Sequence, residues 1–162
     1  MSEHHDPYWK LRPLAPTPVD ELCSCAGSPP VMLQPHLSSN PLSCIACNLE
    51  VPPERIGFSE ALAEKLAFWQ SFHNCFYLLW LDSSEFESWA KAQLSNPGSA
   101  VNKRALELVS DLNSFRSAYY WWFQDTGAED FHPPSRCPVC QGELLERYGR
   151  NVCEPCSLVV PN

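Results

Sequence analysis

CPVCQGELLERYGRNVCEPC, residues 137–156, contains two Cys-x-x-Cys pairs that are separated by twelve residues. Zn²⁺ takes four soft ligands in a tetrahedron, and two cysteines on one tight turn direct their sulfurs to the same side. A β-hairpin between the pairs brings the second pair of sulfurs to the first. We therefore predict a structural zinc ion, which replaces the hydrophobic core that so small a module lacks. Its ligands are Cys137, Cys140, Cys153 and Cys156.

A second group of cysteines lies near the N-terminus, with looser spacing. Cys23 and Cys25 have one residue between them, and eighteen residues separate this pair from Cys44 and Cys47. This spacing also suits a four-sulfur site, so we expect a second structural zinc ion. His36 is an alternative ligand, although a histidine of a surface loop is the simpler interpretation. Iron suits the same sulfur cage at both sites, so the choice between zinc and iron stays open.

Two other kinds of cysteine chemistry are less well supported. A thioredoxin-like interpretation of Cys137-Pro-Val-Cys140 requires a strand–helix junction, whereas this pair opens a proline-flanked hairpin and has a matching second pair. Cys75 is the ninth cysteine, and His73 is close enough in sequence to be considered as its base. Cys75 stands among large apolar residues, however, and we expect it to be buried as a small hydrophobic side chain.

Composition limits the partners of the chain. Its 162 residues include 11 Lys and Arg against 19 Asp and Glu, a formal charge of −8. Eight thiolates and two Zn²⁺ ions would make the total about −12. A nucleic-acid-binding protein normally has a basic face, so this charge disfavours nucleic acid. No apolar run is long enough to span a membrane and the N-terminus does not resemble a signal peptide, so we expect a cytoplasmic protein with reduced cysteines.

We expect an α+β protein with a mainly α-helical central core, flanked by two small zinc-stabilised β-ribbons. Proline, glycine and cysteine content divides the chain into four segments. These are an extended Pro-rich arm over 1–20, an N-terminal zinc ribbon or knuckle over 21–53, a helical core over 54–126 and a C-terminal zinc ribbon over 127–162.

Three helices are predicted in the core. Ser59 caps the first, in which Leu62, Leu66 and Trp69 recur with helical spacing, and the region 76–81 is compatible with either helix or strand. The sequence Ser84-Glu-Phe-Glu87 has the form of a capping box for a second helix that ends near residue 94. The third helix begins at Ser99. Its apolar side comprises Val101, Ala105, Leu108, Leu112, Phe115 and Tyr119.

The C-terminal segment should form a β-hairpin about Gly149, followed by a strand over 158–160. Arg147, Tyr148 and Arg150 lie at the hairpin tip, where two charges and a ring could contact phosphate and base. Three nearby glutamates offset that charge, so a solvated tip is the favoured interpretation. Trp121 and Trp122 are further candidate partner contacts, because adjacent rings cannot both face inward on a strand.

Several stretches resemble a bacterial family of uncharacterised zinc-ribbon proteins with a suggested role in nucleic-acid binding. The similarity covers most of residues 21–156 and implies zinc at the eight cysteines. It is carried by Cys23-x-Cys25-x-Gly27, NPLSCIAC (40–47), LWLDSSEFESWA (79–90), AVNKRALEL (100–108), YYWWF (119–123) and the final ribbon.

The sequence contains no phosphate-binding glycine loop, no His-Glu-x-x-His and no nucleophile elbow. Both predicted zinc sites have four thiolates and therefore no open position for catalysis. We predict a non-enzymatic zinc-ribbon adaptor or regulator that binds another protein, with no small-molecule substrate evident. The alternative is a nucleic-acid-binding regulator that uses the C-terminal ribbon.

Overall fold

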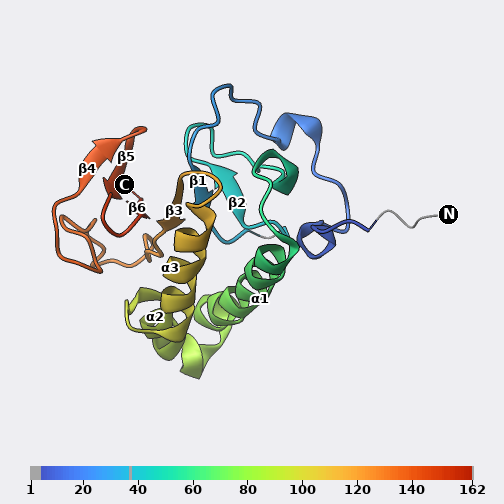
Figure 1. Cartoon of the computed structure of the whole chain (residues 1–162). Helices are drawn as coiled ribbons and strands as arrows, with labels where there is room; N and C mark the ends of the chain where they lie inside the picture. Colours follow the sequence, from blue (N-terminus) through green and yellow to red (C-terminus); the bar gives the residue numbers. More distant parts are fainter. Residues whose placement is uncertain (1–4, 37, 162) are drawn as a thin grey trace.

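The two cysteine-bearing regions belong to one β-sheet. The structure, a computed structural model, describes residues 5–36 and 38–161. Within these residues six short strands form a sheet in the order β2-β1-β3-β6-β5-β4 (Figure 1). The strands are β1 (Val31–Leu33), β2 (Leu42–Cys44), β3 (Ala118–Trp121), β4 (Leu145–Arg147), β5 (Arg150–Cys153) and β6 (Leu158–Val160).

The centre of the sheet is parallel and its two ends are antiparallel hairpins. β3 pairs in parallel with β1 on one side and with β6 on the other. β2 pairs antiparallel with β1. At the opposite end, β5 pairs antiparallel with β6, and β4 pairs antiparallel with β5. The C-terminal β-hairpin and its third strand are therefore confirmed. Tyr148 and Gly149 form its turn with φ values of 56° and 70°, as a two-residue hairpin turn of type I′ requires.

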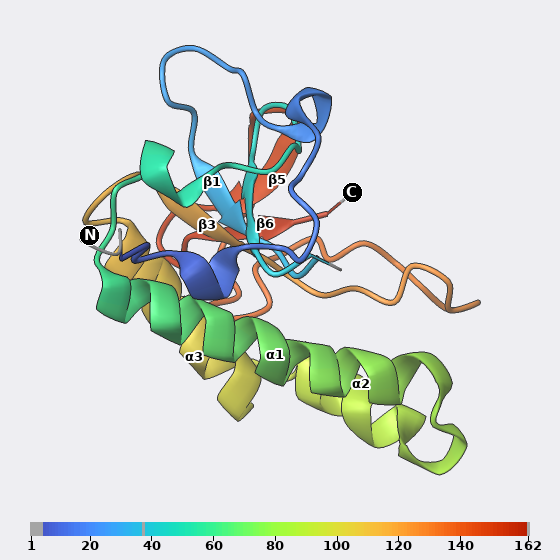
Figure 2. The ribbon, with the colours of Figure 1, turned by 90° about the vertical axis from the view of Figure 1, so that its right-hand side faces the viewer.

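Three α-helices lie together beside the sheet, α1 (Glu60–Asp82), α2 (Glu87–Ser95) and α3 (Ala100–Leu112). Figure 2 shows the distal part of α1, together with α2, reaching beyond the strands. The predicted caps of α1 and α3 are present. Ser59 accepts a hydrogen bond from the backbone N–H of Leu62, and Ser99 accepts one from that of Asn102. The fold is α+β, as predicted, although the helical part of the core is modest.

The region 76–81, which the sequence left open, is the last part of α1. A 3₁₀ turn over Ser84–Phe86 follows, and then α2 begins at Glu87. The Glu87 carboxylate accepts a hydrogen bond of 3.0 Å from the backbone N–H of Ser84, which is one half of the predicted capping box. This bond fixes the reversal between α1 and α2.

The third helix is shorter than the sequence pattern predicted. It ends at Leu112, and Tyr119 lies on β3 and not on the helix. Asn113 supplies the reason. Its side chain donates to the Val109 carbonyl at 2.8 Å and exchanges two hydrogen bonds with the backbone of Ala118. One amide thus closes the helix and aligns the following strand.

The aromatic run 119–123 alternates between the two faces of the sheet. Tyr120 and Trp122 join the larger core cluster, which also contains Trp69 and other α1 and α3 residues. Tyr119 and Trp121 pack on the opposite face, with Met32, Ile45, Val152 and Val159. Successive side chains of a strand point to opposite faces, so both faces of β3 are covered.

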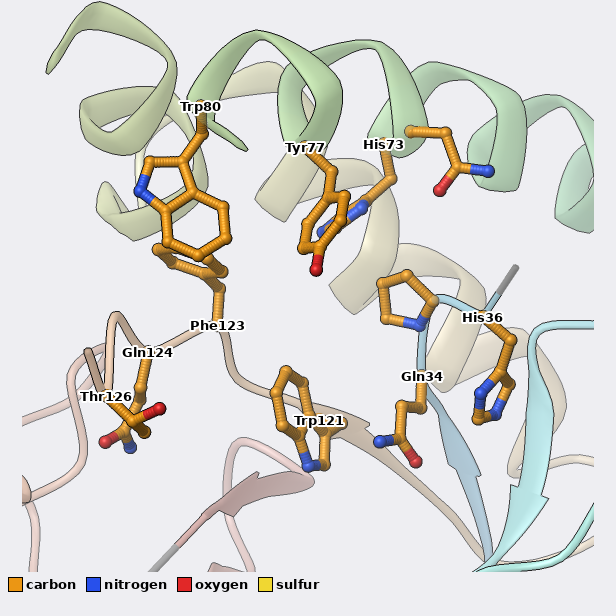
Figure 3. A pocket seen from close by; sticks show the side chains of 11 residues that line it. Gln34, His36, His73, Tyr77, Trp80, Trp121, Phe123, Gln124 and Thr126 are labelled. Carbon is orange, nitrogen blue, oxygen red and sulfur yellow. The ribbon is translucent and has the colours of Figure 1, made fainter. Parts of the chain in front are cut away.

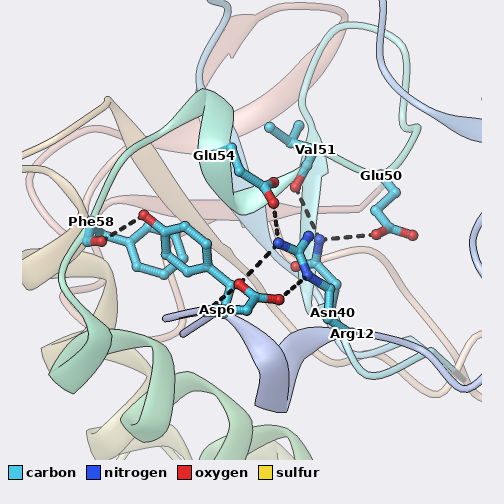
Figure 4. Close-up of polar contacts among 8 residues, drawn as sticks. Asp6, Arg12, Asn40, Glu50, Val51, Glu54 and Phe58 are labelled. Atoms are coloured by element: carbon cyan, nitrogen blue, oxygen red, sulfur yellow. Dashed lines mark hydrogen bonds and ion pairs between the residues drawn. The ribbon is translucent and has the colours of Figure 1, made fainter. Parts of the chain in front are cut away.

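The N-terminal arm is attached to the core by both polar and apolar contacts. Tyr8 donates a hydrogen bond of 2.8 Å to the carbonyl of Phe58 (Figure 4). Arg12 lies between Asp6, at 2.9 Å, and Glu54, to which it also donates. The arm therefore packs against the segment that leads into α1. Residues 1–4 of the predicted arm, residue 37 of the predicted N-terminal ribbon and residue 162 lie outside the described residues.

Candidate metal centres

The N-terminal cysteine group combines two separate segments. Cys44 ends β2 and Cys47 follows in the next turn, whereas Cys23 and Cys25 arrive from the segment before β1. The backbone N–H of Cys23 donates 2.8 Å to the carbonyl of Glu50, which holds the two segments together. The four sulfurs lie within 4.8 Å of one another. This group can therefore hold one metal ion.

Arg55 supports the N-terminal group from outside. Its guanidinium donates to the carbonyl of Cys23 and, at 3.1 Å, to the carbonyl of Cys25. Groups that hydrogen-bond to the ligand-bearing backbone orient the ligands of a metal. Sequence reasoning did not identify this residue, because no spacing rule connects an arginine of a 3₁₀ turn to a cysteine pair 30 residues earlier.

The C-terminal group is built from two tight turns. Cys137 and Cys140 come from the turn before β4, and Cys153 and Cys156 come from the end of β5 and the turn after it. The sulfurs of Cys140 and Cys153 are 3.6 Å apart, and all four sulfurs lie within 4.8 Å of one another. This group can therefore hold a second metal ion.

Backbone amides point at the sulfurs of the C-terminal group. The N–H of Val139 donates to Sγ of Cys137 at 3.4 Å, and the N–H of Gly142 donates to Sγ of Cys140 at 3.4 Å. A Cβ atom at Gly142 would lie 3.1 Å from the same sulfur, so a larger residue would press on the ligand. Amides directed at sulfur stabilise thiolates, which are the form that binds metal.

Hydrogen bonds within each group lower the pKa of one thiol. The N–H of Gly142 and the neighbouring thiols donate to Cys140 and lower its pKa to about 7. Burial opposes ionisation of Cys23, yet the N–H of Cys25 and the neighbouring thiols lower its pKa to about 7. Burial raises the pKa of Cys47 to about 12. Each group thus contains one thiol that ionises more readily than a free cysteine, and the charge of an incoming cation favours loss of the remaining protons.

The arginines of the C-terminal hairpin tip are engaged within the protein. Arg147 forms an ion pair of 3.1 Å with Glu154. Arg150 donates to the carbonyl of Ile45 at 3.2 Å. Tyr148 is exposed between them. The tip therefore does not present two uncommitted cations, as a phosphate-binding surface would.

The two tryptophans predicted as partner contacts differ in accessibility. Trp122 is only 3% exposed and packs edge-on against Tyr120, so this residue belongs to the core and leaves the candidate set. Trp121 is half-buried and lines a cavity. Whether Trp121, Tyr148 or the two arginines contact a partner stays a prediction.

The prediction that Cys75 is buried was wrong. Its side chain is exposed on α1, whereas that of His73 is buried on the helix face towards the sheet. Residues two positions apart on a helix point in widely different directions, so the pair does not form a nucleophile and base. His36 does not join the N-terminal sulfur group and is partly buried beside the same cavity as His73.

The fold and the two sites define this chain as an α+β protein with two four-cysteine groups, each able to hold a metal ion and consistent with zinc-ribbon-like motifs. No protein-family model, curated protein or solved structure matches the chain. The similarity to a bacterial zinc-ribbon family therefore stays a prediction beyond the cysteine groups themselves. No helix in residues 5–36 and 38–161 is long and apolar enough to cross a membrane.

Proposed function

We propose that this protein is a non-enzymatic, cytoplasmic zinc-ribbon adaptor or regulator that binds another protein through its projecting helices. The observation that carries the proposal is a set of exposed apolar side chains on α1, α2 and the turn between them. We call this set the helical-hairpin surface. Its members are Phe68, Cys75, Leu78, Leu81, Phe86 and Trp89.

Part of the helical-hairpin surface is aligned along one helix. Phe68, Cys75 and Leu78 are spaced by seven and three residues, which places them along one side of α1. Leu78 is 64% exposed and Trp89 is 51% exposed. Apolar side chains gathered on a projecting element are typical of protein interfaces, and tryptophan is enriched at interface hot spots.

Acidic side chains beside the helical-hairpin surface favour a protein partner that carries basic side chains. Asp82 and Glu85 are exposed at the turn between α1 and α2, next to Leu81 and Phe86. Acidic side chains beside apolar ones suit a partner with an apolar groove and basic side chains at its edge. The formal charge of −8 on this chain would also attract the basic side chains of such a partner over a longer range.

The metal groups support a structural role for the bound ions. Four cysteine ligands satisfy the tetrahedral preference of Zn²⁺, and zinc is the ion that such ribbons ordinarily hold. A closed set of four thiolates leaves no position for a substrate or an activated water. We therefore assign the two ions to holding the ends of the sheet in place.

Nucleic-acid binding through the C-terminal ribbon is the alternative. Tyr148 is exposed at the tip and could stack on a base. The internal contacts of Arg147 and Arg150 and the acidic charge of the chain weaken this alternative. Binding of RNA or DNA at about physiological salt, lost in Arg147→Glu and Arg150→Glu, would favour it over the protein partner.

The test uses a photo-crosslinking amino acid placed at position 78 of the metal-loaded full chain in cells. We expect one protein to be crosslinked in stoichiometric amounts and then to bind the purified chain directly. The double variant Leu78→Glu, Phe86→Glu should weaken this binding at least about tenfold, because each carboxylate would have to be buried in the interface.

Leu14→Glu is the matched control, because Leu14 is also an exposed leucine but lies on the N-terminal arm. This control should leave binding unchanged. Crosslinking only to a second copy of the chain, or equal loss of binding in the control and the double variant, would contradict the proposal.

A further inference from the structure

A cavity of about 310 Å³ lies at the edge of the sheet, where side chains of α1 meet residues at the ends of β1 and β3, away from both cysteine groups. It opens beyond the carboxyl ends of two neighbouring parallel strands. Gln34, Pro35 and His36 follow β1, and Phe123 and Gln124 follow β3. Ligands of open sheets with parallel strands commonly bind at the carboxyl ends of those strands. The volume suits a molecule of one or two rings.

Aromatic rings bound the cavity on two sides. From α1, Tyr77 points into the space above Trp121 of β3, and Trp80 points towards Phe123 (Figure 3). Trp80 packs edge-on against Phe123, with ring centroids 4.9 Å apart and planes at 83°. The ring centroids of Tyr77 and Trp80 are 5.4 Å apart. A flat ring between these walls would have aromatic contact on both faces.

Polar atoms at this cavity are buried without partners. Both the nitrogen and the oxygen of the Gln124 amide are buried and lack a hydrogen-bond partner among the described residues. The same is true of Nε2 of His36 and Nδ1 of His73, and His73 is only 2% exposed. Buried polar atoms are almost always paired, so three unsatisfied side chains at one cavity indicate a missing polar partner.

The cavity has no charged side chain among its eleven lining residues. Burial also lowers the pKa of His73 to about 4 and lowers that of His36, so both rings are neutral at neutral pH. An ionic ligand would lose its hydration there without gaining an opposite charge. The chemistry of the walls therefore selects an uncharged ligand.

We propose that this cavity binds an uncharged, planar nitrogen heterocycle with adjacent N–H and C=O groups, as in a free nucleobase. The ligand lies between the α1 rings and Trp121. Its N–H and C=O pair with the oxygen and nitrogen of the Gln124 amide, and a further polar atom meets His36 or His73. This binding site is distinct from the helical-hairpin surface, and it does not depend on the proposed function.

The test is a calorimetric and protein-observed NMR titration of the metal-loaded full chain with uracil and with hypoxanthine. We expect at least one of the two to bind saturably, with chemical-shift changes at Trp121 and Tyr77. Gln124→Met retains the bulk of the side chain but removes the amide, and it should weaken binding at least about tenfold. Thr126→Trp adds a ring at the cavity and should also block binding.

Gln93→Met on α2 is the matched control, because it makes the same chemical change away from the cavity. It should bind with the affinity of the unaltered protein. Absence of binding by both heterocycles up to millimolar concentration, or undiminished binding by Gln124→Met, would overturn the proposal. Binding of an uncharged monosaccharide at the same residues, with neither heterocycle bound, would overturn it as well.

Discussion

Arg150 donates a hydrogen bond of 3.2 Å from Nε to the backbone carbonyl of Ile45, which lies 105 residues earlier in the chain. Ile45 stands between Cys44 and Cys47, whereas Arg150 is the first residue of β5, the strand that ends at Cys153. The two cysteine-bearing regions are therefore in direct contact. They share one sheet and one polar bridge, so we expect each site to stabilise the other.

Arg150→Met tests this bridge. The variant keeps the aliphatic stem but loses the bond to Ile45 and a longer contact of 3.4 Å to Asn48. We expect the free energy of unfolding to fall by about 1 kcal/mol, the usual net value of such a bond at a half-buried site. Urea denaturation of the metal-loaded protein measures the change.

Arg147→Met is the control, because its exposed ion pair with Glu154 is worth about 0.5 kcal/mol or less. A larger loss in the control than in Arg150→Met would refute the bridge.

Removing one sulfur ligand should reduce the number of bound ions from two to one. Cys140→Ser removes a ligand of the C-terminal group, and a hydroxyl is a poor substitute for a thiolate. Native mass spectrometry at neutral pH should show a single ion, and thermal denaturation should show a lower midpoint for the whole molecule, because the sheet is continuous. Cys75→Ser is the matched control. This exposed cysteine belongs to neither group, so both ions and the midpoint should be retained. Two ions in Cys140→Ser would contradict the assigned ligands.

Local features of this protein were predictable from the sequence because their causes are local. The spacing of Cys137 and Cys140 determines a metal-binding turn whatever surrounds it, and Ser59 and Ser99 cap helices through bonds that span three residues. The hairpin about Gly149 follows from a turn with positive φ at its central positions. These elements could be identified without knowledge of tertiary contacts.

The parallel centre of the sheet could not be identified in the same way. β1 and β3 are three and four residues long, and they pair across more than 80 positions of sequence. Both faces of β3 are covered, so the run 119–123 has no alternation of apolar and polar residues. The exposure of Cys75 was missed for a related reason. Its neighbours are large and apolar, but the distal part of α1 extends beyond the strands, so they remain partly exposed (Figure 2).

His73 should make stability depend on pH in a defined direction. Burial lowers its pKa to about 4, whereas an unfolded histidine titrates near about 6.5. As the pH falls, His73 is therefore protonated in the unfolded chain before it is protonated in the folded protein. The contribution of neutral His73 to the free energy of unfolding is fully present above about pH 6.5 and is lost as the pH falls towards about 4. It amounts to about 3 kcal/mol in total. His73→Phe removes this term, so between about pH 7.5 and about pH 5 its free energy of unfolding should fall by about 2 kcal/mol less than that of the unaltered protein.

Chemical denaturation at the two pH values measures this difference. Release of metal in acid, and the titration of His36, occur in both proteins and cancel in the comparison. His132→Phe is the control, because His132 is exposed in the segment before the C-terminal cysteine group. It should lose as much stability as the unaltered protein. An equal pH response in His73→Phe and His132→Phe would show that His73 is not buried in its neutral form.

Asn102 links α2, α3 and β3 through one buried side chain. Its amide nitrogen donates to the carbonyls of Leu94 at 3.0 Å and Asn96 at 2.8 Å, which completes the C-terminus of α2. Its amide oxygen accepts a bond of 2.8 Å from the hydroxyl of the buried Tyr120. Asn102→Ala would leave these groups without partners, so we expect a loss of about 3 kcal/mol. Tyr120→Phe removes one bond and should cost about 1 kcal/mol.

The double variant of Asn102 and Tyr120 distinguishes a shared hydrogen bond from two independent effects. If the bond is real, the combined loss in chemical denaturation should be smaller than the sum of the single losses by about 1 kcal/mol. Tyr77→Phe is the matched control, because the Tyr77 hydroxyl has no hydrogen bond within residues 5–36 and 38–161. Combined with Asn102→Ala, it should be additive. Additive losses for Asn102 and Tyr120 as well would mean that the buried amide does not couple α3 to the strand.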